Sequence, residues 1–259
     1  MLHWICPSRG RLPLAHIYAG ISGMPLSVES FDLGEGVLLK RTYARLFSPF
    51  LVAFAPPGPE GRHPPPWSAA EGGFGFDVHV QLSLPDSSSL GGESSATDLV
   101  WWIAALLRVA RFPYVSVPVL SSHPFADIPA AKEKVRLRPM EVTPRIMRPT
   151  EETPTTSDSA LEWVKDRWVP AGRLLYSHRA FRSAFQAFDS ATLDSKRSSS
   201  LLALWGALEQ LFGSGRYRIA SFIAAYLSPP GDERLATYRR VLQLYDARSA
   251  AAHTADNAE

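Results

Sequence analysis

The feature of this sequence that most restricts its fold is a change in hydrophobic period about midway along the chain. In FDVHVQLSL (residues 76–84) apolar and polar residues alternate strictly, which is typical of a strand with one buried face. After about residue 158 the apolar residues recur every three or four positions, which is typical of amphipathic helices. A chain that is mainly strand-like in its first part and helical in its second, without repeated strand–helix units, predicts an α+β fold.

The first part, residues 1–145, predicts a mostly antiparallel β domain with one helix. The segment FDLGEGVLLKR (31–41) is typical of a hairpin with its turn at Gly34–Gly36. Further strands are predicted from FLVAFA, YVSVPVL and KVRLRPM. The helix is predicted from an apolar stripe, with Ser95 or Thr97 as its N-cap; the stripe consists of Leu99, Trp102, Ile103, Leu106 and Ala110.

The composition changes in PRIMRPTEETPTTSD (144–158), which is rich in proline, threonine and glutamate. We therefore expect a linker over residues 146–157 and an all-α domain over residues 158–259. Five helices are predicted in this second domain, and their short connections favour an antiparallel bundle. Their signatures are a capping box at Ser159 and Glu162 in a helix through Trp168, the stripe Leu174, Phe181, Phe185 and Phe188, the segments LLALWGALEQLFG and RYRIASFIAAYL, and the stripe Leu235, Tyr238, Val241, Leu242 and Tyr245 after Asp232. In the LLALWGALEQLFG helix the core positions are expected at Leu201, Leu204, Trp205, Leu208, Leu211 and Phe212.

Charge and composition argue against several classes of function. The chain has 27 basic and 25 acidic residues, a net charge of +2; residues 1–149 carry 14 and 12, and the remainder 13 and 13. Neither part has the broad positive excess of a non-specific nucleic-acid binder. Cys6 is the only cysteine, and no two histidines have metal-ligand spacing. We expect no metal, no cofactor and no intramolecular disulfide.

The sequence also predicts a cytoplasmic protein without a membrane partner. The longest apolar run, LVWWIAALL (99–107), is about half the length that a membrane span requires. The N-terminal segment lacks the charged region followed by an apolar run that is typical of a signal peptide.

The last predicted helix contains the residues that most directly suggest chemistry. Arg248 continues the apolar stripe after Tyr245, where a buried or half-buried side chain is expected. An arginine at such a position requires a partner or a function, because an isolated desolvated charge costs several kcal/mol. His253 follows about 140° around and roughly 7.5 Å along an ideal helix. The two side chains converge only if the helix ends between them, or if two copies meet at a dimer axis.

Three segments, LWGALEQLFG, RIASFIAAYL and LYDARSAAAHT, together resemble the HEPN superfamily, specifically its Apea-like branch. The shared signature is an arginine followed four to six residues later by a histidine, near the end of a five-helix bundle. Here the signature is Arg248 and His253, and the resemblance covers about residues 160–256. Members of the superfamily usually continue past the histidine into another helix, whereas this sequence ends at Glu259.

The resemblance implies a homodimeric, metal-independent endoribonuclease of a prokaryotic phage-defence or toxin type. Its substrate would be RNA, and its partners an antitoxin or a phage-derived trigger. Arg248 would stabilise charge on the phosphate, and His253 would act as general acid and base. Ser249, Tyr245 and Glu209 would support Arg248. By analogy with such fusions, the N-terminal domain would sense a trigger or restrain the nuclease.

Two other interpretations stay open. A non-catalytic HEPN-like module for dimerisation or partner binding predicts that Arg248 forms an intramolecular ion pair with Glu209 or Asp246. It also predicts that His253 faces solvent, away from a dimer axis. A small-molecule binder built on the N-terminal sheet is the third interpretation, and no particular residue of the sequence supports it.

Overall fold

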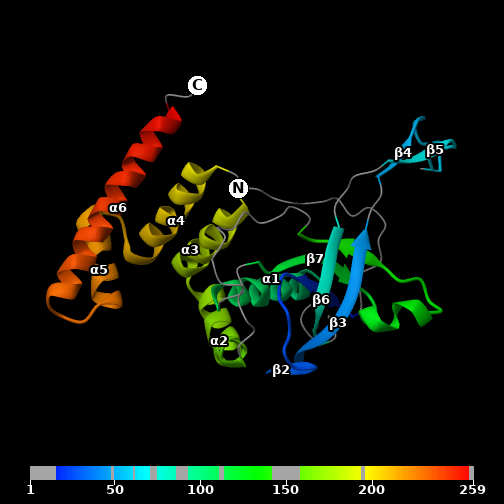
Figure 1. The fold of residues 1–259 in the computed structure, drawn as a ribbon, viewed down its shortest axis with the longest axis horizontal. Coiled ribbons are helices and arrows are strands. Elements are labelled where there is room, and N and C mark those ends of the chain that lie inside the picture. Colours follow the sequence, from blue (N-terminus) through cyan, green and yellow to red (C-terminus); the bar gives the residue numbers. More distant parts are fainter. Residues whose placement is uncertain are drawn as a thin grey trace. The chain divides into compact units, whose positions relative to one another are not determined.

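The computed structural model describes residues 16–47, 50–60, 62–70, 75–85, 93–110, 114–141, 158–193 and 196–256. The elements follow the α+β order expected from the sequence, with an antiparallel sheet first and helices after it (Figure 1). The chain divides into two compact units, Met1–Val142 with Pro154–Lys165 (unit 1) and Thr143–Thr153 with Asp166–Glu259 (unit 2). The predicted linker, residues 146–157, lies outside the described residues.

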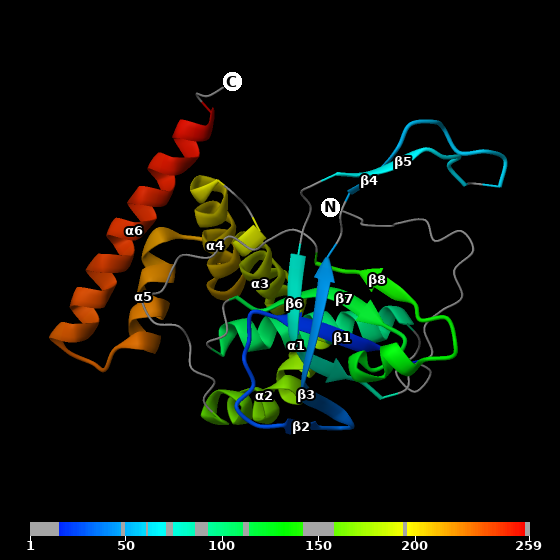
Figure 2. The ribbon, with the colours of Figure 1, turned by 45° about the vertical axis from the view of Figure 1, so that its right-hand side comes forward.

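Unit 1 contains a six-stranded sheet in which each described pair of neighbouring strands is antiparallel. Its order is β2-β3-β6-β1-β7-β8, so β1 lies between β6 and β7 (Figure 2). These strands are β1 (Tyr18–Ser22), β2 (Ser30–Gly34), β3 (Val37–Phe47), β6 (Gly75–Ser83), β7 (Ser116–Ser121) and β8 (Leu137–Pro139). A separate two-stranded sheet pairs β4 (Phe50–Ala53) with β5 (Trp67–Ala70).

The hairpin predicted at residues 31–41 is confirmed as β2 and β3. Its two turn residues, Glu35 and Gly36, have φ angles of 53° and 76°. Positive φ at both central residues is typical of a type I′ turn, whose twist matches that of the paired strands. The backbone N–H of Gly34 donates to the Asp32 carboxylate at 2.8 Å and fixes the start of the turn.

Strand β6 confirms the strand predicted at residues 76–84, but its two faces are not simply apolar and polar. Gln81, expected on the polar face, is buried with 4% of its surface exposed. Its amide oxygen accepts a hydrogen bond from the backbone N–H of Phe125, the first residue of the 3-10 helix η1 (Phe125–Ala130), at 2.8 Å. Val78 also packs against Phe125. Residues of both predicted faces, Val78 and Gln81, thus contact η1, which the sequence pattern missed.

Helix α1 (Glu93–Val109) lies across the sheet and is buried on more than the predicted stripe (Figures 1 and 2). Every residue from 102 to 108 is buried, including Arg108. The predicted N-cap, Ser95 or Thr97, is wrong because the helix already contains both residues. Ala96, which is fully buried, extends the apolar face by another turn, and packing of this face outweighs the local preference of serine and threonine for a cap.

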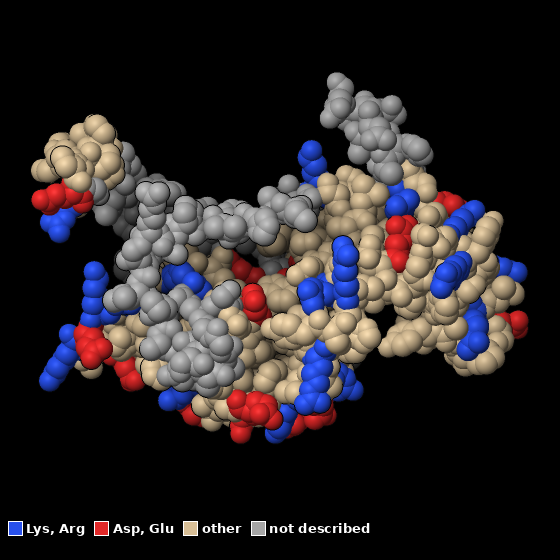
Figure 3. Space-filling model, turned by 180° about the vertical axis from the view of Figure 1, so that it is seen from behind, with Lys and Arg blue, Asp and Glu red and all other residues tan. Residues whose placement is uncertain are grey.

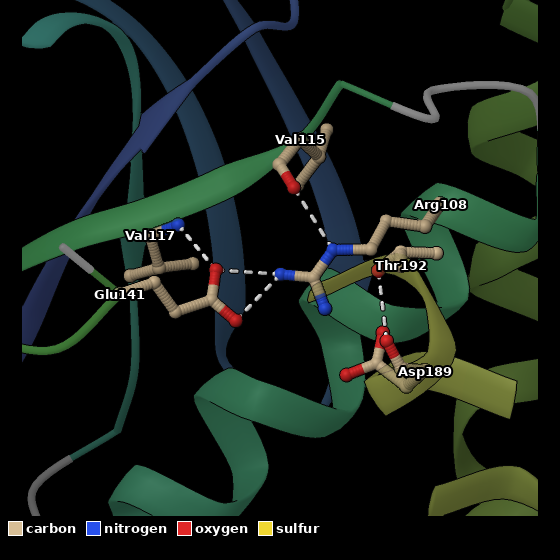
Figure 4. A network of polar contacts seen from close by, with 6 residues as sticks. All are labelled: Arg108, Val115, Val117, Glu141, Asp189 and Thr192. Atoms are coloured by element: carbon tan, nitrogen blue, oxygen red, sulfur yellow. Dashed lines mark hydrogen bonds and ion pairs between the residues drawn. The ribbon is translucent and has the colours of Figure 1, made fainter. Parts of the chain in front are cut away.

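A buried polar network ties α1 to the strands beside it (Figure 4). The Arg108 guanidinium donates to both carboxylate oxygens of Glu141 at 2.7 and 2.8 Å, and its Nε donates to the carbonyl of Val115 at 2.9 Å. Glu141 also accepts from the backbone N–H of Val117 at 2.9 Å. Both carboxylate oxygens accept from the same nitrogen, Nη2 of Arg108, and the two charges are paired in a setting where an unpaired charge is costly.

The five helices predicted after the linker are all present, and they follow one another with short connections. They are α2 (Asp158–Ser177), α3 (Arg179–Ser190), α4 (Arg197–Phe212), α5 (Arg216–Leu227) and α6 (Asp232–Asp256), with a short 3-10 helix η2 (Ala191–Leu193) between α3 and α4. The boundary between the first two is a correction, because α2 continues through Pro170 and ends at Ser177. Leu174 therefore lies on α2, not on the helix of Phe181. Ser159 likewise lies inside α2 rather than at its N-cap.

The core of unit 2 lies where α4, α5 and α6 meet (Figures 1 and 2). It is built on Trp205, Ile219, Ala220 and Val241, with seven partly buried apolar side chains around them. Three residues predicted for these stripes, Leu204, Leu211 and Leu235, are instead 36–47% exposed. The stripes are wider than the faces that neighbouring helices cover, so their margins stay in contact with solvent. Across the described residues, we find no helix with the length and hydropathy needed to cross a bilayer.

Candidate functional site

Helices α4 and α6 bring together four of the five predicted site residues. Tyr238, Val241, Leu242 and Tyr245 hold α6 against the core of unit 2. Arg248 and Ser249 follow on this side of α6, and both are partly buried. Glu209 lies near the C-terminal end of α4 and is partly buried too. Arg248 is thus half-buried, which is one of the two settings that the helical stripe predicts for it.

The Arg248 guanidinium is held between an acid and an aromatic ring. Its Nη2 lies 3.5 Å from Glu209 Oε1, and the two side chains are 27% and 25% exposed. Its Cζ lies 5.5 Å from the centroid of the Tyr245 ring, within the range of a cation–π interaction. Nε of Arg248 is buried and has no acceptor among the described residues. The long ion pair leaves hydrogen-bonding capacity on a guanidinium whose orientation is already restricted.

Tyr245 and Ser249 contribute to the site in different ways. The Tyr245 ring packs edge-on against Trp205, with centroids 5.2 Å apart and planes at 80°. This contact fixes the ring beneath Arg248. The Ser249 hydroxyl donates to the carbonyl of Tyr245 at 3.3 Å, one turn earlier on the same helix. Ser249 therefore satisfies its hydroxyl on the α6 backbone.

Asp246, the other acid considered as a partner of Arg248, pairs with a different arginine. Arg216, the first residue of α5, donates to Asp246 at 2.6 Å. Its Nε is likewise buried without an acceptor among the described residues. The sequence did not predict this second pair, because the only signal was an arginine after a glycine-rich turn. Two acids thus hold two arginines on neighbouring helices.

His253 lies on α6, which runs as one helix from Asp232 to Asp256. The position of its side chain lies outside the described residues. Because the helix does not end between Arg248 and His253, one of the two routes to convergence is excluded. On a single continuous helix the two positions differ by about 140°. A shared site would therefore need Arg248 or His253 from a second copy of the chain.

The electrostatics of the surface agree with the near-neutral composition. On the face shown in Figure 3, basic and acidic side chains are interspersed, and neither sign forms a continuous tract. Within the described ranges there is no group of three His, Cys, Asp or Glu side chains arranged to hold a metal ion. If Arg248 contacted RNA, the contact would therefore involve a few residues and not a broad basic surface.

Comparison of the chain with protein-family models, with curated proteins and with solved structures gives no match. The resemblance to the HEPN superfamily therefore stays a prediction.

Proposed function

We propose that the chain is a homodimeric, metal-independent endoribonuclease of a defence or toxin type, in which Arg248 and His253 act on the phosphodiester of RNA. The observation that supports this proposal most directly is the setting of Arg248. Its guanidinium is half-buried, oriented by Glu209 and Tyr245, and retains unused donors on a helix that continues unbroken to His253.

The chemistry requires no metal. The neutral imidazole of His253 would take the proton of the ribose 2′-hydroxyl as its oxygen attacks the adjacent phosphorus. A protonated His253 from the second copy would donate a proton to the departing 5′-oxygen. The products are a 2′,3′-cyclic phosphate and a 5′-hydroxyl. Arg248 would stabilise the negative charge that accumulates on the non-bridging phosphate oxygens, because its planar fork matches two of them.

The first experiment is cleavage of a mixed pool of single-stranded RNA with EDTA present. We expect the wild-type protein to cleave, and His253→Ala and Arg248→Ala each to lose about 100-fold or more in rate. Arg240→Ala is the matched control, because Arg240 is an exposed arginine on the same helix. Cleavage that EDTA abolishes, or that all three variants retain, would contradict the proposal.

A second candidate, the non-catalytic dimerisation or partner-binding module, is favoured by two observations. Arg248 forms the intramolecular ion pair with Glu209 that this interpretation predicted. Helix α5 also exposes large apolar side chains, with Phe222 at 46%, Tyr226 at 85% and Leu227 at 63%. Under this interpretation a folded dimer cleaves no RNA. Tyr226→Ser then weakens self-association or partner binding, whereas Arg248→Ala leaves both unchanged.

A further inference from the structure

Unit 1 contains a cavity on its sheet, and none of its lining residues belongs to the α4–α6 site. The cavity has a volume of about 220 Å³ and lies over β1, β3 and β6, with the start of η1 as one wall. The side chains that matter for its chemistry are Tyr18, Lys40, Thr42, Gln81, Ser83 and Asp127. The strand register places them together, because Lys40 pairs with Gln81 and Tyr18 pairs with Ser83.

The floor of the cavity is fixed by hydrogen bonds. The amide oxygen of Gln81 accepts from the backbone N–H of Phe125 at 2.8 Å, and its amide nitrogen donates to Ser83 Oγ at 2.9 Å. Because Ser83 Oγ is an acceptor in this bond, its own proton is available to donate elsewhere. The buried Gln81 thus sets the orientation of a hydroxyl donor at the base of the cavity.

The charged side chains at the cavity come from two elements, with positive charge on β3 and negative charge on η1. The ammonium of Lys40 has no ion-pair partner among the described residues, so it supplies a free positive charge on the β3 side. Arg41 also lines the cavity, but Glu29 neutralises it through hydrogen bonds of 2.8 and 3.2 Å. Asp127, on η1, supplies a negative charge on the other side. The net charge of these groups is near zero, which disfavours a doubly charged phosphate and favours a ligand with one charge of each sign.

We propose that this cavity binds a free amino acid as its zwitterion. The carboxylate would accept hydrogen bonds from Lys40 and Ser83, and the ammonium would donate to Asp127. A cavity of about 220 Å³ is smaller than the 300–1,000 Å³ of typical drug-sized sites, and it suits a ligand of this size. Charge-assisted hydrogen bonds at both ends would orient the ligand and distinguish it from a simple anion.

The test is calorimetric titration of the full-length protein with each standard amino acid, up to millimolar concentrations. The same titration with the matching α-hydroxy acids and with inorganic phosphate distinguishes a zwitterion from an anion. We expect at least one amino acid to bind, and its hydroxy acid and phosphate to bind about tenfold more weakly or not at all. Failure of every amino acid to bind, or equal binding of the hydroxy acid, would overturn the proposal.

Single substitutions test whether the ligand binds in this cavity. Lys40→Met is expected to weaken binding of the amino acid about tenfold or more, because a charged hydrogen-bond donor is lost. Asp127→Asn is expected to remove the preference for the amino acid over its hydroxy acid. Lys132→Met is the matched control, because Lys132 is an exposed lysine of the same unit and does not line the cavity. If Lys40→Met keeps a native circular dichroism spectrum and binds the amino acid as strongly as the wild type, the ligand binds elsewhere and the proposed site is wrong.

Discussion

Among single residues, the Arg108–Glu141 pair gives the clearest prediction about the free energy of unfolding. The two side chains are 3% and 13% exposed, so neither charge is well solvated. Glu141→Ala leaves the Arg108 guanidinium buried without its carboxylate partner. We expect a loss of about 3 kcal/mol in the free energy of unfolding, because breaking a buried pair leaves one charge uncompensated. Urea denaturation measures this loss.

The chain supplies a matched control for that substitution. Arg41 and Glu29 form a pair of the same types in unit 1, but their side chains are 55% and 66% exposed. Glu29→Ala is therefore expected to cost less than about 1 kcal/mol. If the two glutamate variants lose equal stability, burial does not determine the energetics of these pairs, and the account of the network in Figure 4 is wrong.

At the scale of elements, strand β1 shows where sequence patterns are insufficient. Its sequence, YAGIS, is short, contains a glycine, and has no clear alternation. It nevertheless occupies the middle of the sheet, because β6 and β7 pair with it on either side. Both neighbours of β1 come from distant parts of the chain, and pairing with them stabilises the strand. Its own residues therefore give little indication of a strand in the sequence.

Gly20 in β1 yields a prediction about how closely this part of the unit is packed. A Cβ at this position would lie 2.8 Å from Val78 Cγ2 and 2.9 Å from Phe125 Cζ. Gly20→Ala therefore requires the side chain of Val78, that of Phe125, or both to shift. We expect a loss of about 1–3 kcal/mol in unfolding free energy, as for other overpacked cores.

The double variant Gly20→Ala with Phe125→Leu should recover part of the stability lost in Gly20→Ala, because the smaller side chain removes one of the two contacts. Thermal unfolding of the two variants, with Phe125→Leu alone as reference, measures this coupling. Strict additivity of the two changes would show that the contact with Phe125 is not the cause.

The helices were more predictable than the strands, for a physical reason. Each helix contains its own hydrogen bonds and its own apolar period, so α4, α5 and α6 can be located from local sequence. Pro170 is the exception, since a proline is expected to end or kink a helix and α2 continues through it. The same period places Arg248 and Tyr245 on one side of α6. It could not decide whether Glu209 or Asp246 pairs with Arg248, because that choice depends on how α4 and α5 pack.

At the scale of the whole molecule, the two compact units divide one helix between them. Residues 158–165, the first two turns of α2, belong to unit 1, and the rest of α2 belongs to unit 2. Two contacts within unit 1 support this assignment: Ser27 donates to Asp158 at 3.2 Å, and the Lys165 ammonium lies 5.7 Å from the centre of the Phe31 ring. A periodic sequence cannot reveal such a division, because the helical pattern is the same on both sides of it.

This division predicts which fragments of the chain fold. Leu161 and Val164 are fully buried and belong to unit 1. A fragment of residues 1–157 lacks both side chains and loses about 3–6 kcal/mol of apolar burial, a large part of the 5–15 kcal/mol that stabilises a typical domain. We expect residues 1–177 to give a soluble fragment with a cooperative urea transition, and residues 1–157 to unfold at much lower urea or to aggregate. Within the longer fragment, Leu161→Ala should cost about 2–5 kcal/mol, whereas Glu162→Ala, at an exposed position of the same turn, should cost less than about 1 kcal/mol. Equal stability of the two fragments would mean that unit 1 is complete without α2, and that the boundary between the units lies before the helix.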